Sequence, residues 1–244
     1  MGASRAMAAG NDAIYLNPAA LGATRQYTAA LDYVHDTGPG FGGDSIIVSL
    51  ADSISNARFP GGMSYRYVSL QTPEGAQKGS LTDIAVGLQL SSAFTIGTRV
   101  SYQTTGDSKQ FTGDLGGLLS FGSLNLSVVG FNLIKVDTPS GARGLSAGAA
   151  LSDGVNYRLG GDVRWEWGDN SSSVQSYALG GEYLLADTVP LRAGYNWDNV
   201  RQTRFLSFGT GIYISSFGAD VSFRRDIHSR ENMFVFSIKL FGGH

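Results

Sequence analysis

The chain has 244 residues, and 34 of them are glycine, about twice the usual share, which argues against a helical protein. Its formal net charge of −2 gives no basic surface for nucleic acid, and the absence of cysteine excludes disulfides and thiolate metal sites. Hydrophobic residues make up 42%, yet no apolar run approaches the ~20 residues of a spanning helix, so a membrane span would have to consist of strands. Cysteine-free chains are also compatible with passage through an oxidising periplasm.

Residues 1–26 come first and show no alternation of polar and apolar positions. Met1–Ala9 is too short and too polar for a signal peptide, which predicts a mature chain or one whose leader has been replaced. Further on, Asn17 precedes Pro18, which favours an extended or turn conformation with an Asx-type bond at Asn17. The alternative is that Asn17 caps a short helix that starts at Pro18 and lines the first strand. Both versions place this segment against the interior of whatever follows.

From Tyr27 to the end, the chain alternates with a period of two in roughly 14 segments of about ten residues each. Val155–Trp167 is an example, because one face is apolar and ends in two tryptophans while the other carries Asn, Arg, Asp and Glu. The same division recurs in Phe94–Gln103 and Phe217–Arg224. Successive side chains of a strand point to opposite faces, so each segment predicts a strand with one apolar and one charged face.

The links between these segments alternate in length. The short links are Ile54–Ala57, Ser92–Ala93, Gly122–Ser123, Ser152–Gly154, Ala186–Thr188 and Ser215–Ser216. The long polar links are Thr37–Gly43, Gln71–Ser80, Thr104–Gln110, Lys135–Ala142, Gly168–Ser173, Asp198–Thr203 and Asp226–Arg230. Outer-membrane barrels have short periplasmic turns and longer outer loops, and here long links open and close the series. We therefore expect an even number of strands and both termini in the periplasm.

A soluble β-sandwich or propeller would also give many short strands, and alternation by itself does not distinguish inside from outside. Besides the links, two features favour a membrane barrel. Aromatic residues lie near strand ends, as interfacial girdles require: Tyr27, Tyr33, Tyr102, Trp165, Trp167, Tyr183, Tyr195 and Trp197. The polar faces carry balanced charges suited to pairing in a confined lumen: Asp32, Asp83, Asp114, Asp162, Glu166, Glu182 and Asp220 against Arg66, Arg99, Arg158, Arg164, Arg192, Arg224 and Lys239. We expect an all-β fold, a 14-stranded antiparallel transmembrane β-barrel.

The N-terminal stretch Ser4–Gly22 reads SRAMAAGNDAIYLNPAALG. It resembles the N-terminal signature of the FadL-like outer-membrane proteins, and of the PorV/PorQ branch in particular. The positions that carry the resemblance are Arg5, Ala6, Asp12, Ala13, Asn17, Pro18, Ala19 and Leu21. The resemblance implies a 14-stranded barrel in the bacterial outer membrane, residues 27–244, with residues 1–26 folded inside it as a hatch. The outer loops are shorter than is usual in this family, which puts substrate capture and fatty-acid transport in doubt.

Catalytic chemistry is not indicated. The chain has three histidines, His35, His228 and His244, and His35 and His228 read as rim residues beside aspartates. The repeats Leu159–Asp162 and Leu179–Glu182 lie mid-strand, which indicates close backbone approach in a narrow lumen rather than phosphate loops. We expect no enzyme activity, no metal and no cofactor.

Arginines near the outer ends of the last strands could contact lipopolysaccharide or an acidic partner, although ordinary rim pairing is at least as good an interpretation. These residues are Arg201, Arg204, Arg225 and Arg230. Two functions follow from the resemblance. The PorV-like interpretation, favoured here by the short loops and the balanced lumen charges, is a structural adaptor of an envelope-spanning machine for secretion or surface motility, with other envelope proteins as partners. The FadL-like alternative is a diffusion channel for small hydrophobic molecules such as fatty acids.

Overall fold

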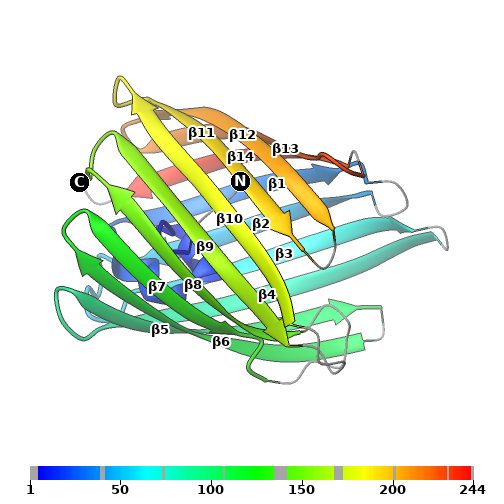
Figure 1. Ribbon diagram of the computed structural model, residues 1–244, viewed down its shortest axis with the longest axis horizontal. Coiled ribbons are helices and arrows are strands. Elements are labelled where there is room, and N and C mark those ends of the chain that lie inside the picture. The colour runs from blue at the N-terminus through cyan, green and yellow to red at the C-terminus, as the bar shows by residue number, and fades with distance from the viewer. Residues whose placement is uncertain are drawn as a thin grey trace.

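The computed structural model describes residues 5–38, 42–72, 75–106, 108–134, 142–167, 173–199, 202–229 and 231–242. Two short helices precede fourteen strands (Figure 1). They are α1 (Asn11–Leu16), η1, a 3₁₀ helix (Pro18–Gly22), β1 (Tyr27–Asp36), β2 (Gly43–Asp52), β3 (Gly61–Thr72), β4 (Gly75–Gln89), β5 (Phe94–Thr105), β6 (Ser108–Phe121), β7 (Leu124–Phe131), β8 (Arg143–Ser152), β9 (Tyr157–Trp167), β10 (Ser173–Leu185), β11 (Val189–Asp198), β12 (Thr203–Ile214), β13 (Phe217–Asp226) and β14 (Asn232–Gly242). Among the described residues, no helix is both long and apolar enough to cross a membrane.

The fourteen strands form one closed antiparallel barrel, as the sequence predicts. Each strand pairs with its neighbours in the chain, and β14 closes the sheet on β1. Tyr27, for example, pairs with Asp52 on β2 and with Gly242 on β14. A closed sheet has no free edge, so every strand can satisfy its backbone N–H and C=O groups without water.

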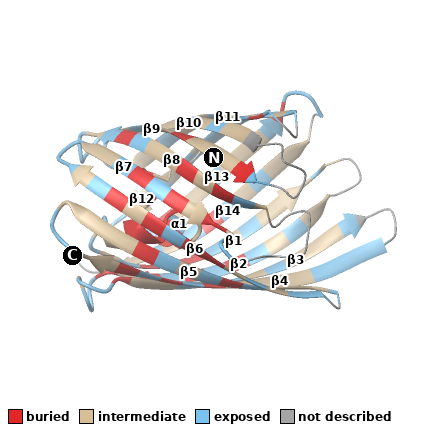
Figure 2. Ribbon diagram, turned by 60° about the horizontal axis from the view of Figure 1, so that its bottom comes forward, coloured by how far each residue is buried: buried red, intermediate tan, exposed pale blue. Residues whose placement is uncertain are grey.

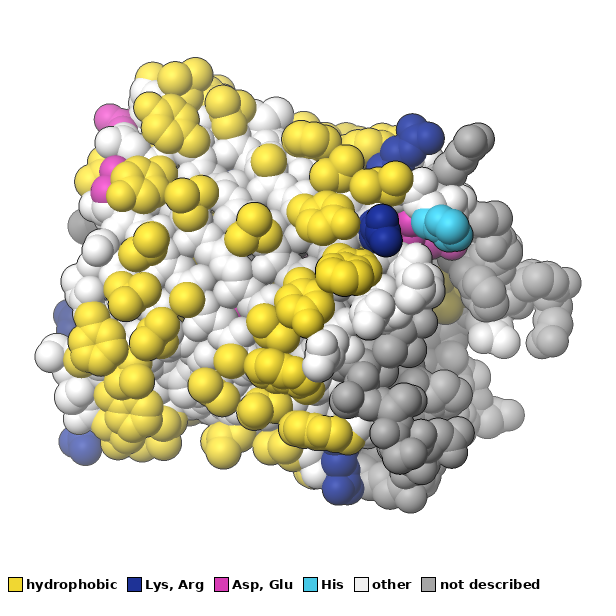
Figure 3. All heavy atoms as spheres, viewed as in Figure 1, with side chains coloured by type: hydrophobic (Ala, Val, Ile, Leu, Met, Phe, Trp, Pro, Cys, Tyr) yellow, Lys and Arg dark blue, Asp and Glu magenta, His cyan; other side chains and the backbone are white. Residues whose placement is uncertain are grey.

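The apolar face of each strand points outward. Large apolar side chains cover the outer wall (Figure 3), including Ile84 at 56% and Leu179 at 66% exposure. The opposite faces hold buried polar groups such as Asp83 and Ser146, both at 0% exposure. A water-soluble sandwich would bury the first set and expose the second. The distribution is that of a barrel whose outer wall faces lipid and whose interior is polar.

The link lengths expected from the sequence are wrong at three places. Gln71–Ser80 and Thr104–Gln110 were expected as loops, but strands occupy most of both ranges. Strand β3 ends at Thr72 and β4 begins at Gly75, while β5 ends at Thr105 and β6 begins at Ser108. Polar strands can extend beyond the lipid because water solvates their side chains there and the paired strand satisfies their backbone hydrogen bonds. Conversely, the expected short link Ile54–Ala57 belongs to a longer connection, residues 53–60. We call the end where β14 finishes and where this connection lies the turn end, and the opposite end, where the β3–β4 hairpin projects, the loop end (Figure 1).

Residues 5–26, here called the inner segment, lie within the barrel, where α1 is largely buried (Figure 2). Both local expectations at Asn17 are confirmed: the residue is extended before Pro18 (φ −157°), and its side-chain oxygen accepts a bond from Ala19 N at 3.1 Å. Pro18 starts η1, so Asn17 is also the helix N-cap. The short helix does not line the first strand, however, because it packs on β4, β5 and β6.

Candidate functional site

The inner segment is fixed to one wall of the barrel. Helix α1 packs against β1–β4, and η1 packs against β4–β6. Three inward glycines in one ladder row, Gly87, Gly97 and Gly116, make room for it. An added Cβ at Gly97 would overlap the backbone of Pro18 and Ala19, and one at Gly116 would overlap Asn17. Because these glycines have no side chains, the backbone of the inner segment can approach the backbone of the sheet closely.

Polar bonds attach the segment along its length. Asn11 Nδ2 donates to Ser49 O at 3.1 Å and to Ser49 Oγ at 2.6 Å, and Thr28 donates to the Asn11 side-chain oxygen. Asn17 Nδ2 donates to Gly117 O at 3.4 Å. Across the lumen, Arg5 N donates to Asp162 Oδ2 at 2.7 Å, which connects the segment to β9.

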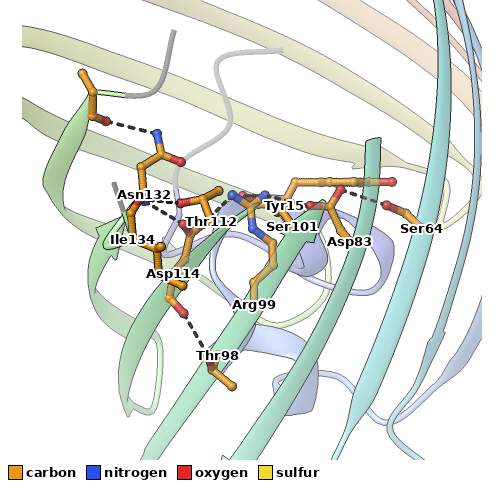
Figure 4. A network of polar contacts seen from close by, with 11 residues as sticks. Tyr15, Ser64, Asp83, Thr98, Arg99, Ser101, Thr112, Asp114, Asn132 and Ile134 are labelled. Carbon is orange, nitrogen blue, oxygen red and sulfur yellow. Dashed lines mark hydrogen bonds and ion pairs between the residues drawn. The ribbon is translucent and has the colours of Figure 1, made fainter. Parts of the chain in front are cut away.

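Arg99 joins the inner segment to β4, β5 and β6 (Figure 4). Its guanidinium lies 2.5 Å from Asp114 and 3.7 Å from Asp83, and it donates to Tyr15 O at 3.3 Å. Asp83 also accepts from Ser64 at 3.1 Å and from Ser101. Both carboxylates are almost fully buried, so Arg99 offsets charges that would otherwise be unfavourable there.

A second network lies on the opposite wall. Arg192 pairs with Glu182 at 2.5 Å and with Asp220 at 2.6 Å, and Lys239 pairs with Asp220 at 3.2 Å. Arg192 also donates to the Tyr213 hydroxyl. These strands therefore hold their inward charges in cross-strand pairs, and Asp12 of the inner segment adds a negative charge near Lys239.

All fourteen residues expected in the lumen network are on inward faces, but they do not form one network. Arg164 pairs with Glu166 at 2.7 Å, and Asp162 holds Arg5. Among the described residues, no ion pair is made by four of the fourteen: Asp32, Arg66, Arg158 and Arg224. Whether the network serves to keep the lumen closed stays a prediction.

Of the residues in the N-terminal motif, Asn17, Pro18, Ala19 and Leu21 are buried at the β4–β6 wall, whereas Asp12 is exposed to the lumen. Of the rim arginines, Arg204 lies 5.9 Å from the Trp197 ring and Arg225 is exposed on the outer wall. Arg201 and Arg230 lie outside the described residues. Within the described part of the chain, no group of three or more His, Asp or Glu side chains is placed to hold a metal ion.

Two cavities lie between the inner segment and the wall opposite its attachment. The loop-side cavity, about 240 Å³, is lined by Arg5, Leu16, Asp162, Arg164, Ser176, Ala178, Asn196, Phe205, Ser207 and Arg224. The turn-side cavity, about 320 Å³, is lined by the inner segment together with residues of β9–β14 such as Arg158, Glu182 and Arg192. Leu16 lines both cavities.

The ladder of β9, β10 and β11 relates the two cavities to each other. The row Asp162–Ala178–Asn196 borders the loop-side cavity, and the row Arg158–Glu182–Arg192 borders the turn-side cavity. The inward row between them is Gly160–Gly180–Gly194, which has no side chains. Leu16 and this glycine row therefore form the boundary between the two cavities.

A third cavity, about 450 Å³, continues toward the turn end. It shares Met7 and Arg158 with the turn-side cavity and reaches the β6–β7 and β8–β9 turns. There Asp153 accepts bonds from Tyr157 N at 2.9 Å and Asn156 N at 2.8 Å, which hold the pKa of its carboxyl below its usual value. The three cavities follow one another along the inner segment, and we call this series the conduit.

Sequence reasoning missed Leu16 and the different roles of the two glycine rows. It expected close backbone approach at the repeats Leu159–Asp162 and Leu179–Glu182. The close approach lies instead at Gly97 and Gly116, and the repeats border the conduit. No local signal separates the two rows, because both consist of inward glycines on neighbouring strands.

Neither a protein-family model nor a curated protein sequence matches the chain. Solved structures do match it. A Pseudomonas aeruginosa FadL homologue superposes with a TM-score of 0.68 at 13% identity, over 98% of this chain and 97% of that one. The P. putida toluene transporter TodX gives 0.72 at 14% identity, over 96% and 95%, and the monoaromatic hydrocarbon channel CymD gives 0.72 at 12%, over 96% and 93%. The fold is that of FadL-like outer-membrane channels. These neighbours give no support to the PorV/PorQ branch.

Proposed function

We propose that the protein is an outer-membrane channel for the diffusion of small hydrophobic molecules, with the conduit as their path. The observation that carries this proposal is the pair of cavities on either side of Leu16, bordered by the side-chain-free row Gly160–Gly180–Gly194. A hydrophobic molecule needs a continuous lined route through an otherwise polar lumen, and small movements of one leucine would join these cavities. The structural neighbours TodX, a toluene transporter, and CymD, a monoaromatic hydrocarbon channel, support the same class of cargo.

The adaptor function becomes the weaker interpretation. It rested on the PorV-like resemblance, on the short loops, and on a lumen filled by the N-terminal segment and closed by balanced charges. In the structure the segment packs on β1–β6, and cavities remain beside β9–β13. A purely structural barrel has no need of such cavities. We therefore place the FadL-like alternative first and find no observation that specifically favours secretion or motility.

The proposal includes an orientation. The turn end would face the periplasm together with both termini, and the loop end would face the medium, since short turns are periplasmic in barrels of this kind. The inner segment would then act as the hatch: it is attached to one wall and leaves Leu16 as the element that molecules must pass. Lipopolysaccharide would surround the loop end, near Arg204 and Arg225.

Uptake of radiolabelled toluene by cells that display the barrel tests the proposal. Gly180→Trp would place an indole between the two cavities, so we expect initial uptake to fall several-fold toward that of cells without the barrel. The matched control is Leu179→Trp, which adds the same group one residue away on the outer wall and should leave uptake unchanged. Wild-type uptake no faster than that of barrel-free cells, or unimpaired uptake through Gly180→Trp, would refute the channel.

A further inference from the structure

We propose that the loop-side cavity is a binding site for small aromatic carboxylates, held by the guanidinium of Arg224. This inference rests on the proposed channel function and goes beyond it, since it assigns a charged class of cargo and a binding residue. The cargoes named for the neighbouring channels CymD and TodX, monoaromatic hydrocarbons and toluene, are uncharged.

Positive charge is concentrated at this cavity. Three arginines line it, Arg5 from the inner segment, Arg164 from β9 and Arg224 from β13, and Asp162 is its one acidic lining residue. Arg164 pairs with Glu166 at 2.7 Å. The lining therefore holds three guanidinium groups and one carboxylate, and Glu166 pairs with one of the three.

Arg224 is the arginine available to a ligand. Arg5 donates to Ser146 Oγ at 3.2 Å, and Arg164 is held by its ion pair and by the Phe131 ring at 4.0 Å. Arg224, by contrast, has neither a hydrogen bond nor an ion pair with the described residues. The acids whose charges reach it are Asp36, Asp226 and Glu231, and none of them lies within ion-pair distance.

The surroundings of Arg224 fit a ring that carries a carboxylate. Its guanidinium lies 4.3 Å from the centre of the Phe205 ring, which fixes one face of the planar group and leaves its donors free for a bidentate acceptor. Leu16 and Phe205 offer apolar contacts, and Asn196 offers an additional donor. A volume of about 240 Å³ lies below the ~300–1,000 Å³ typical of drug-sized ligands, so the ligand is a single small ring rather than a long chain.

The next cation along the conduit is placed for release. Arg158 lines the cavity on the other side of Leu16 and likewise makes no ion pair with a described residue. A carboxylate that leaves Arg224 toward the turn end would meet a second guanidinium rather than an uninterrupted row of carboxylates. The lumen would thus present two weak anion sites in series, separated by Leu16.

The test is calorimetric titration of the detergent-purified barrel with benzoate and with benzamide, which has the same shape and no charge. We expect benzoate to bind at least about tenfold more tightly, the factor that 1.4 kcal/mol represents. Arg224→Gln should remove this preference, and Arg224→Lys, which keeps the charge without the planar fork, should keep part of it. Arg225→Gln is the matched control, because it makes the same change on the outer wall.

Several results would overturn the site: equal affinities for benzoate and benzamide, equal losses in Arg224→Gln and Arg225→Gln, or inorganic phosphate that binds as tightly as benzoate. Failure of the site is distinguishable from failure of the channel. Toluene uptake without selective benzoate binding would remove the site and leave the channel. Selective benzoate binding that Arg224→Gln abolishes, in a barrel that takes up no toluene, would support the site and remove the hydrocarbon channel.

Discussion

A single methyl group at Gly97 should loosen the inner segment from its wall. An added Cβ there would overlap backbone atoms of Pro18 and Ala19, which have no rotamer by which to move away. At Gly117, on the outward face of β6, an added Cβ would find its nearest neighbours at 3.9 and 4.0 Å, which is ordinary contact. Gly97→Ala and Gly117→Ala therefore make the same chemical change in adjacent strands with different consequences.

The expected difference follows from two terms. Replacing glycine by alanine within a strand stabilises by roughly 0.5–1 kcal/mol, because the unfolded chain loses freedom. Overpacking against a fixed structure costs roughly 1–3 kcal/mol. Gly117→Ala carries the first term alone and should be neutral or slightly stabilising. Gly97→Ala carries both, so the two variants should differ by roughly 1–3 kcal/mol, with Gly97→Ala the less stable.

Urea unfolding of the refolded barrel in detergent, followed by tryptophan fluorescence, measures this difference. Limited proteolysis gives a second reading, since a displaced inner segment should be cleaved faster within residues 5–26 in Gly97→Ala than in Gly117→Ala. Equal unfolding midpoints together with equal cleavage rates would mean that the inner segment does not rest on the Gly87–Gly97–Gly116 row.

The remaining predictions concern the buried charges, the lipid face and the orientation. Arg99→Ala should destabilise the barrel by about 3–5 kcal/mol in the same unfolding assay, because it leaves two buried carboxylates without their cation; a loss below about 1 kcal/mol would contradict the pairing. Val163→Arg, on the outer wall, should cost ~2–4 kcal/mol, whereas Val163→Ala should cost far less, and indistinguishable values would mean that the assigned face is wrong. A protease site inserted within Gln71–Ser80 should be cleaved on intact cells and one within Ser152–Gly154 should not, and the reverse pattern would invert the proposed orientation.

The closed barrel was predictable because its signal is local and repeated. Alternation within Phe94–Gln103 or Phe217–Arg224 assigns each side chain to a face, and the structure keeps these assignments. Link lengths were less predictable. Polar composition suggested a loop at Gln71–Ser80, yet Gln71 pairs with Ala76 in a hairpin. The composition of a segment indicates whether it lies in lipid or in water, but it does not indicate where a strand ends. A strand continues into water wherever its partner strand continues beside it.

The sequence placed the inner segment inside the barrel, but the wall to which it attaches was beyond reach for a different reason. Its attachment depends on contacts between residues far apart in the chain, such as Asn11 with Ser49 and Asn17 with Gly117. A glycine leaves the same pattern whether a backbone packs on it, as at Gly97, or a cavity lies beside it, as at Gly180. Only the docked segment decides which glycine row is filled and which borders the conduit.

Equal numbers of inward acids and bases do not imply a neutral lumen at every point. At the wall that holds the inner segment, one guanidinium, that of Arg99, meets two carboxylates. At the loop-side cavity three arginines and one aspartate line the space, because the inner segment adds Arg5 to Arg164 and Arg224. A low effective dielectric in a confined lumen strengthens the interaction of each charge with its nearest neighbours, so the placement of the charges matters as well as their total. The balance of seven against seven suggested a closed, purely structural barrel, but its uneven distribution places positive charge where a molecule would enter the conduit, and so favours a channel with a preference among its cargoes.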